Sequence, residues 1–152
     1  MNNQDVLVLI VDDDVVVRET LRAAVALEGY RFALAADGRE ALNKLAEVQP
    51  DVVLLDVMMP GMDGFEVTRR IKNNPATILI PVILVTALDS RQERMQGIAA
   101  GADDFLNKPI DRLQLLTRLA TVARLRRVSR ELDDAETVLE SLARSIEAKD
   151  AT

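Results

Sequence analysis

Cysteine and histidine are both absent from this chain of 152 residues. Without them the chain cannot form a disulfide framework, a zinc finger, a catalytic thiol, a Ser-His-Asp triad or an imidazole metal site. It also cannot donate a phosphoryl group from a histidine of its own. Any metal must therefore be held by oxygen atoms, which favours Mg²⁺ or Ca²⁺.

An excess of positive charge and long apolar segments are lacking as well. The chain has 19 Lys and Arg residues against 25 Asp and Glu residues, a net charge of −6, so it is poorly suited to binding DNA or an anionic membrane. The apolar segment Val6–Val11 is followed directly by three aspartates and is too short for a signal segment or a membrane span. We therefore expect a cytoplasmic protein that contacts neither nucleic acid nor membrane directly.

Short apolar segments alternate with amphipathic ones, and 49% of the residues are apolar, enough for the core of one domain. The expected strands are Val6–Val11, Arg31–Ala35, Asp51–Leu55, Pro81–Thr86 and Asp104–Asn107. Three of them are apolar throughout, which is typical of a parallel sheet covered by helices on both faces. Five strand–helix units with right-handed crossovers predict a doubly wound, flavodoxin-like α/β fold with the strand order 2-1-3-4-5.

The segments between the strands carry apolar residues at helical spacing, which predicts the helix faces that cover the sheet. The first helix is expected to use Val17, Leu21, Val25 and Leu27, and the fourth Met95, Ile98 and Ala99.

The final segment, residues 112–152, contains no glycine, proline or aromatic residue, which predicts one long helix. Its apolar residues follow alternating spacings of three and four, the heptad pattern of a coiled coil. This seam consists of Leu125, Val128, Leu132, Ala135, Leu139, Leu142 and Ile146. The pattern favours pairing with a second copy, and a lone helix folded back on the domain is the alternative. The four arginines among residues 124–130 are interpreted as a solvated face.

Polar residues stand at the end of four expected strands: Asp12, Asp13 and Asp14 after the first, then Asp56, Thr86 and Lys108. Each has an ordinary interpretation alone, and Asp14 is expected to be a helix N-cap. Ligands of an open parallel sheet, however, bind outside the carboxyl ends of its strands. The sequence therefore predicts one site at this edge.

The charges of the predicted site restrict its chemistry. Two carboxylates about 4 Å apart repel by roughly 4 kcal/mol at an effective dielectric constant near 20. Lys108 offsets only one of the charges, so a cation with oxygen ligands, Mg²⁺ above all, is expected. A carboxylate nucleophile, a metal, a hydroxyl and a lysine together indicate a phosphoryl-acceptor site.

Four motifs resemble those of the receiver domain of two-component response regulators, in the same order and at the same spacing. They are Val-Asp-Asp-Asp at 11–14, Leu-Leu-Asp-Val-Met-Met-Pro-Gly-Met-Asp-Gly at 54–64, Val-Thr-Ala at 85–87 and Gly-Ala-Asp-Asp-Phe-Leu-Asn-Lys-Pro at 101–109. The resemblance covers residues 5–125 and leaves residues 126–152 as a helical extension.

The resemblance implies a role for each residue of the predicted site. Asp56 would accept a phosphoryl group from a sensor histidine kinase or a phosphotransfer protein. Asp12 and Asp13 would be the acidic pair that binds Mg²⁺, with Mn²⁺ as the alternative ion, together with Asp56 and the backbone carbonyl of Met58. Lys108 would pair with Asp56 and then with the phosphoryl group, next to a cis peptide bond.

Two further pairs of residues follow from the same resemblance. Thr86 and Phe105 would form the conformational switch, with Phe105 as an ordinary core residue being the alternative. Met58 and Leu88 stand where family members tune hydrolysis of the acyl phosphate. Because both are apolar and cannot hydrogen-bond a water molecule, we expect slow autodephosphorylation.

Residues 139–150 resemble the helix that leads into HD-GYP domains, which hydrolyse cyclic di-GMP. With no histidine, this chain cannot hold the metals of such a domain. The expected function is a phosphorylation-dependent switch, itself not an enzyme, that forms a homodimer through its last helix and controls an output domain. The alternatives are a stand-alone adaptor or phosphate sink, and the regulatory half of a diguanylate cyclase. A haloacid-dehalogenase-like phosphohydrolase is disfavoured, because Met58 stands where its second aspartate would be.

Overall fold

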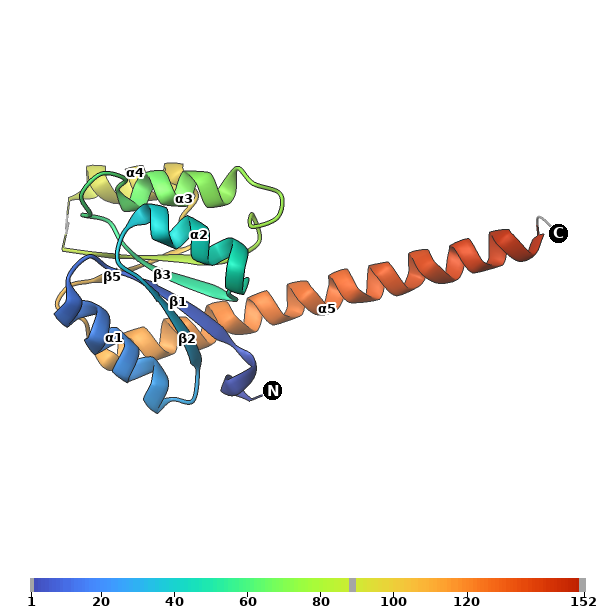
Figure 1. The fold of residues 1–152 in the computed structure, drawn as a ribbon, viewed down its shortest axis with the longest axis horizontal. Coiled ribbons are helices and arrows are strands. Elements are labelled where there is room, and N and C mark those ends of the chain that lie inside the picture. The colour runs from blue at the N-terminus through green and yellow to red at the C-terminus, as the bar shows by residue number, and fades with distance from the viewer. Residues whose placement is uncertain (1, 88–89, 151–152) are drawn as a thin grey trace.

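The computed structural model describes residues 2–87 and 90–150. A short 3-10 turn, Asn3–Asp5, precedes five strands and five helices that alternate along the chain (Figure 1). The elements are β1 (Leu7–Val11), α1 (Val15–Leu27), β2 (Arg31–Ala35), α2 (Gly38–Val48), β3 (Val52–Asp56), α3 (Gly64–Lys72), β4 (Val82–Thr86), α4 (Arg91–Ala100), β5 (Asp104–Asn107) and α5 (Arg112–Asp150). All strand pairs are parallel and the order is β2-β1-β3-β4-β5. The predicted flavodoxin-like fold and strand order are confirmed.

The sheet is covered on both faces, which explains why its central strands are apolar throughout. On one face, Val8, Ile10 and Leu54 pack against α1 and the first part of α5. On the other, Leu9, Val53 and Leu55 pack against α2, α3 and the ring of Phe105. Alternate residues of β1 and β3 therefore serve two separate cores, and neither face can carry polar side chains.

Side-chain caps fix where the helices begin. Asp14, Asp37, Asp63 and Ser90 each accept hydrogen bonds from backbone N–H groups in the first turn of α1, α2, α3 and α4. These bonds satisfy donors that have no partner within a helix. The expectation that Asp14 is an N-cap is confirmed, and the cap starts α1 directly after the acidic end of β1.

Helix α5 is the longest element and has two parts with different surroundings. Its first turns bury Leu115, Leu119, Val122 and Ala123 against the sheet. The helix then continues far beyond the domain as a single straight stalk (Figure 1). At 1.5 Å per residue its 39 residues span about 58 Å. The predicted long helix is confirmed, and the predicted boundary at residues 125/126 lies inside it.

The predicted face of α4 is wrong. Met95, Ile98 and Ala99 are exposed, whereas Gly97 and Ala100 face the interior. Helix α4 approaches the sheet through its smallest residues, because a side chain at Gly97 would overlap the ring of Phe105. Leu27, expected on the buried face of α1, is also exposed and is the last residue of that helix.

No helix in the described part of the chain is both long enough and apolar enough to cross a membrane.

Candidate functional site: an acidic pocket with a lysine

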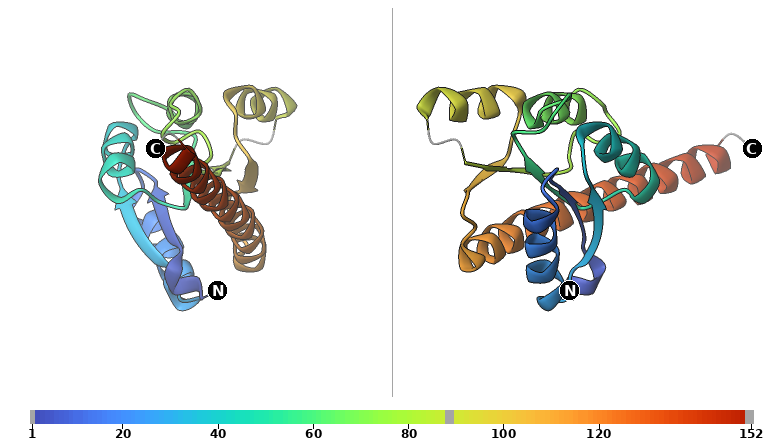
Figure 2. Two further views of the ribbon diagram at one scale, coloured as in Figure 1. Left: turned by 90° about the vertical axis from the view of Figure 1, so that its right-hand side faces the viewer. Right: turned by 60° about the vertical axis from the view of Figure 1, so that its left-hand side comes forward.

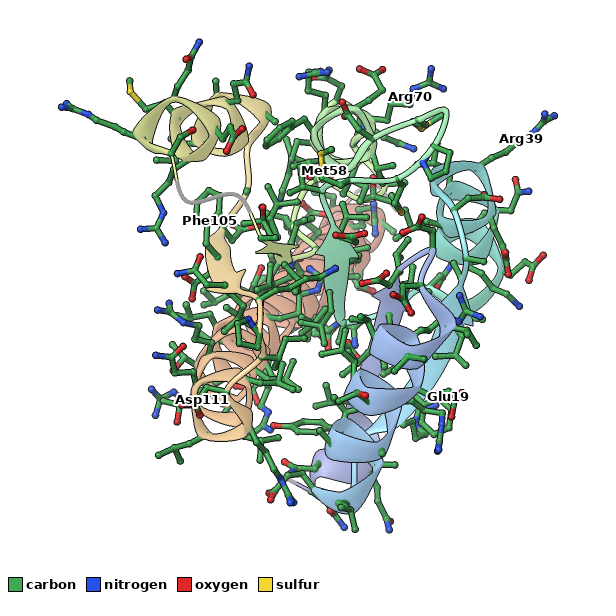
Figure 3. All side chains as sticks on the ribbon, turned by 90° about the vertical axis from the view of Figure 1, so that its left-hand side faces the viewer. Glu19, Arg39, Met58, Arg70, Phe105 and Asp111 are labelled. Atoms are coloured by element: carbon green, nitrogen blue, oxygen red, sulfur yellow. The ribbon has the colours of Figure 1, made fainter. Side chains whose placement is uncertain are left out.

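The candidate site lies at the edge of the sheet where the strands end. Asp12 follows β1 directly, Asp56 is the last residue of β3, and Thr86 is the last of β4. Lys108 follows β5. Figure 3 views the molecule from this edge, with Met58 just beyond β3 and Phe105 on β5. The structure thus brings together the polar residues that the sequence placed at four strand ends.

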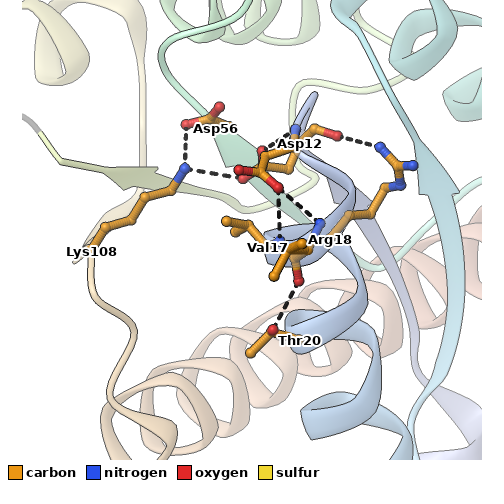
Figure 4. A network of polar contacts seen from close by, with 8 residues as sticks. Asp12, Val17, Arg18, Thr20, Asp56 and Lys108 are labelled. Atoms are coloured by element: carbon orange, nitrogen blue, oxygen red, sulfur yellow. Dashed lines mark hydrogen bonds and ion pairs between the residues drawn. The ribbon is translucent and has the colours of Figure 1, made fainter.

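Asp12 is fully buried, and backbone contacts hold its carboxylate in place. Its Oδ1 accepts a hydrogen bond from the backbone N–H of Asp14 at 2.9 Å. Its backbone carbonyl accepts another from the guanidinium of Arg18, one turn into α1, at 2.8 Å (Figure 4). The other carboxylate oxygen, Oδ2, faces the ammonium group of Lys108 at the centre of the site.

Lys108 joins the two buried carboxylates. Its Nζ lies 3.2 Å from Oδ2 of Asp12 and 3.1 Å from Oδ1 of Asp56 (Figure 4). The backbone N–H of Lys108 donates to the carbonyl of Thr86 at 2.9 Å, and the Lys108–Pro109 peptide bond is cis. One ammonium group thus bridges the ends of β1 and β3.

Among the described residues, the carboxylates of Asp12, Asp13 and Asp56 form a cluster that includes both partners of Lys108. Oxygen atoms of Asp12, Asp13 and Asp56 all lie within 4.8 Å of one another, and Asp13 is exposed at the mouth of the cluster. Burial and the charge of Asp12 raise the pKa of Asp56 to about 6, although Lys108 acts in the opposite direction. A single lysine leaves this cluster with excess negative charge, which an added cation with oxygen ligands would offset.

Thr86 and Phe105 lie on neighbouring strands beside the cluster and line one cavity of about 310 Å³. Thr86 is buried at the end of β4, and Phe105 on β5 is 9% exposed. The guanidinium of Arg94 on α4 lies 5.0 Å from the centre of the Phe105 ring. The cavity therefore lies between the end of β4, β5 and the first turn of α4, next to the Phe105 ring.

Of the two residues expected to tune hydrolysis of the acyl phosphate, Met58 and Leu88, the structure describes Met58. Met58 is 64% exposed, two residues beyond Asp56 at the rim of the site. Leu88 lies outside the described residues.

Two residues that shape the site were not predicted as part of it. Arg18 hydrogen-bonds the backbone carbonyl of Asp12, but in the sequence it is one of several polar residues of α1 and has no distinguishing pattern. Gly64 packs against the backbone of Asp56, and a Cβ there would overlap the carbonyl oxygen of Asp56. In the sequence, Asp63-Gly64 is an ordinary turn pair. Only the packing against Asp56 explains why residue 64 is a glycine.

Comparisons with known proteins agree with this geometry. The pattern of the response regulator receiver domain family matches residues 8–120. Response regulator PleD of Caulobacter vibrioides is 47% identical over 129 residues, which cover 85% of this chain and 28% of PleD. Response regulator MprA of Mycolicibacterium vanbaalenii is 47% identical over 119 residues, 78% of this chain and 51% of MprA.

A solved structure supports the same relationship. The chemotaxis protein CheY4 of Vibrio cholerae superposes with a TM-score of 0.74 at 35% identity, covering 77% of this chain and 98% of CheY4. This chain spans about a quarter of the length of PleD and about half of the length of MprA.

Proposed function

This chain belongs to the family of response regulator receiver domains, and from that membership we propose that Asp56 accepts a phosphoryl group from a phosphohistidine. The donor is a sensor histidine kinase or a phosphotransfer protein. A carboxylate oxygen of Asp56 forms the new P–O bond as the P–N bond of the donor breaks. The P–N electron pair stays on the ring nitrogen, and because the other ring nitrogen carries a proton, the donor leaves as a neutral imidazole and Asp56 becomes an acyl phosphate. The chain itself acts as a phosphoacceptor switch in the cytoplasm.

The observation that carries this proposal is the position of Lys108 between two buried carboxylates. Its ammonium group lies 3.1 Å from Asp56 and remains beside that carboxylate to pair with the phosphoryl oxygens. With a pKa of about 6, Asp56 is mostly ionised at pH 7 and so available as a nucleophile.

The other carboxylates suit a divalent cation. Asp12 and Asp13, with Asp56 and the backbone carbonyl of Met58, would hold Mg²⁺ or Mn²⁺. Such an ion neutralises the negative charge that gathers when a phosphoryl group approaches three carboxylates. The oxygen-only donor set of the site fits this ion.

Thr86 and Phe105 form the proposed switch. The hydroxyl of Thr86 moves toward the new phosphoryl group, and the ring of Phe105 rotates into the space that the hydroxyl leaves, beside the cavity that both residues line. The ring is in contact with Gly97 and near Arg94, so its movement changes the packing of α4. Phosphorylation thereby favours one of two packing states.

Phosphorylation of the chain by a small donor tests the proposal. With acetyl phosphate and MgCl₂, we expect the intact mass to rise by about 80 Da, the mass of one phosphoryl group, because Asp56 is activated within the site itself. The added group should be removed by hydroxylamine, which cleaves acyl phosphates, and should not form in EDTA. A chain that gains no mass, or gains a hydroxylamine-stable group, contradicts the proposal.

The lifetime of the acyl phosphate follows from the same measurement. Met58 and Leu88 offer no hydrogen bond to an attacking water molecule, so we expect a half-life of minutes or longer once the donor is removed. A half-life of seconds with Mg²⁺ present would show that other groups position the water.

The stalk of α5 is the proposed route to the output. Six of the seven seam residues are large apolar side chains that are 47–66% exposed. Exposed apolar side chains at this spacing favour pairing with a second copy of the chain, and therefore a dimer rather than a stand-alone adaptor. The stalk would then pass the state of the receiver to an output domain, with an HD-GYP phosphodiesterase as the first candidate and a diguanylate cyclase as the second.

A dimer through the seam can be tested by sedimentation over a concentration series. We expect the chain to dimerise and Leu139→Gln to shift the equilibrium toward monomer, because the substitution places a polar group in the seam. Thr137→Gln, on the opposite side of the helix, should sediment like the wild type. A monomer at every concentration, or equal effects of the two substitutions, contradicts this interface.

A further inference from the structure

A second cavity lies at the opposite edge of the sheet, where β3 and β4 begin. It is enclosed by the end of α2, the end of α3, the segment between α3 and β4, and the root of the α5 stalk, and its volume is about 480 Å³. Figure 2 (left) looks toward this edge, with the stalk coming forward beside α2 and below α3. The size lies within the range of small-molecule sites, and the cavity shares no residue with the acidic pocket.

Three guanidinium groups line this cavity: Arg70 from α3, and Arg126 and Arg130 from α5. No acidic residue is among the described residues that line it. Arg70 pairs with Glu66 and Arg130 pairs with Asp51. We call Arg70, Arg126 and Arg130 the arginine pocket.

Arg126 differs from Arg70 and Arg130, because it has no ion-pair partner among the described residues. It makes no hydrogen bond or ion pair with any residue that the structure describes, and its Nε is shielded from water without a partner. Burial and the neighbouring charge of Arg130 lower the pKa of Arg126, and the carboxylates of Asp51 and Asp133 offset this shift only in part. A guanidinium group in such surroundings is stabilised by an anion, and oxyanions match its planar donors in a bidentate manner.

The rest of the lining indicates that the ligand is more than a simple ion. The walls include the apolar side chains of Leu42, Leu45 and Ile71. The side-chain amides of Gln49 and Asn74 also line the cavity. The amide oxygen of Asn74 accepts from the backbone N–H of Ala76 at 3.0 Å, which leaves the amide nitrogen to donate to a ligand.

We propose that the arginine pocket binds a nucleoside phosphate. The guanidinium groups of Arg126, Arg70 and Arg130 would hold the phosphate, the apolar walls would cover the faces of the base, and the two amides would contact its edge. Because the ligand would touch α5 as well as α2 and α3, it would tie the root of the stalk to the domain. This site is separate from Asp56 and does not depend on the proposed phosphorylation.

Calorimetric titration of the full chain with ADP and with GDP tests this site. EDTA is present, so that the acidic pocket cannot bind the nucleotide through Mg²⁺. We expect one molecule bound per chain, with inorganic pyrophosphate and adenosine each binding more weakly than ADP. Asp56→Asn should bind as the wild type does, which separates this result from the proposed function.

Arg126→Gln should weaken nucleotide binding about tenfold or more, since a hydrogen-bonded charge is lost. Arg126→Lys, which keeps the charge and the aliphatic stem, should weaken it less. Arg124→Gln is the matched control, because Arg124 is exposed on the same helix and does not line the cavity.

Three results would overturn the proposal. Failure of both nucleotides to bind removes the site. Equal weakening of nucleotide binding by Arg124→Gln and Arg126→Gln shows a general attraction of anions to the positive charge of α5, without a specific site. Binding of pyrophosphate as tight as that of ADP excludes a contribution from the base.

Discussion

Replacing Asp56 by Asn is expected to abolish phosphorylation of the chain. The amide has nearly the shape of the carboxylate, but it carries no charge and is not a nucleophile. The ammonium group of Lys108 would remain in place, since it also contacts Asp12 at 3.2 Å. With acetyl phosphate and Mg²⁺, we expect the amount of acyl phosphate in Asp56→Asn to fall at least about a hundredfold, measured by intact mass.

Asp14→Asn provides the matched control for this loss. It removes the same unit of charge two residues from Asp12, and asparagine caps a helix as well as aspartate does. The side chain of Asp14 contacts only the first turn of α1 in the described part of the chain. We expect Asp14→Asn to be phosphorylated at close to the wild-type rate. Acyl phosphate that persists in Asp56→Asn would place the acceptor on another carboxylate.

The central strands were predictable because one physical cause dominates them. A strand buried on both faces must be apolar at every position, and β3 and β4 are buried throughout. The edge helix α4 was not predictable in this way. Its sequence contains larger apolar residues, such as Met95, but its position is set by the close approach of Gly97 to Phe105. A search for large apolar residues therefore selects the wrong face of such a helix.

The candidate site was predictable to the extent that topology determines it. Parallel strands end at one edge, so residues as distant in sequence as Asp12 and Lys108 had to approach one another. Contacts within the site could not be derived in this way. The hydrogen bond from Arg18 to the carbonyl of Asp12 depends on the rotation of α1 about its axis, which the strand ends do not determine.

The same distinction applies to α5. Its heptad pattern predicted an apolar seam, and in the structure of one chain the large apolar residues of that seam are exposed. The solvated face expected for the arginines of residues 124–130 is confirmed for Arg124 and Arg130, which are exposed, but the Nε atoms of Arg126 and Arg127 are shielded from water. Sequence spacing alone gives no sign that α2 and α3 approach this part of the helix.

The raised pKa of Asp56 carries a cost in stability. The carboxyl group moves from an ordinary value of 3.8 in the unfolded chain to about 6 in the folded chain. The folded state therefore binds this proton more tightly than the unfolded state does. Between about pH 4 and pH 6 the unfolded chain has released the proton and the folded chain has not, so the free energy of unfolding falls as the pH rises. Above about pH 7 the full cost is present, about 3 kcal/mol.

Asp56→Asn should remove this cost, since an amide does not titrate. In urea unfolding with EDTA, we expect Asp56→Asn to be more stable than the wild type by about 2–3 kcal/mol at pH 7.5, and by close to zero at pH 4. Added Mg²⁺ should narrow the difference at pH 7.5 by stabilising only the wild type, because the cation binds the ionised carboxylates of the folded state. A difference that is the same at both pH values would show that ionisation of Asp56 is not its cause. The effect of Asp56→Asn on stability would then come from packing, and the pKa of Asp56 would not be raised in the folded chain.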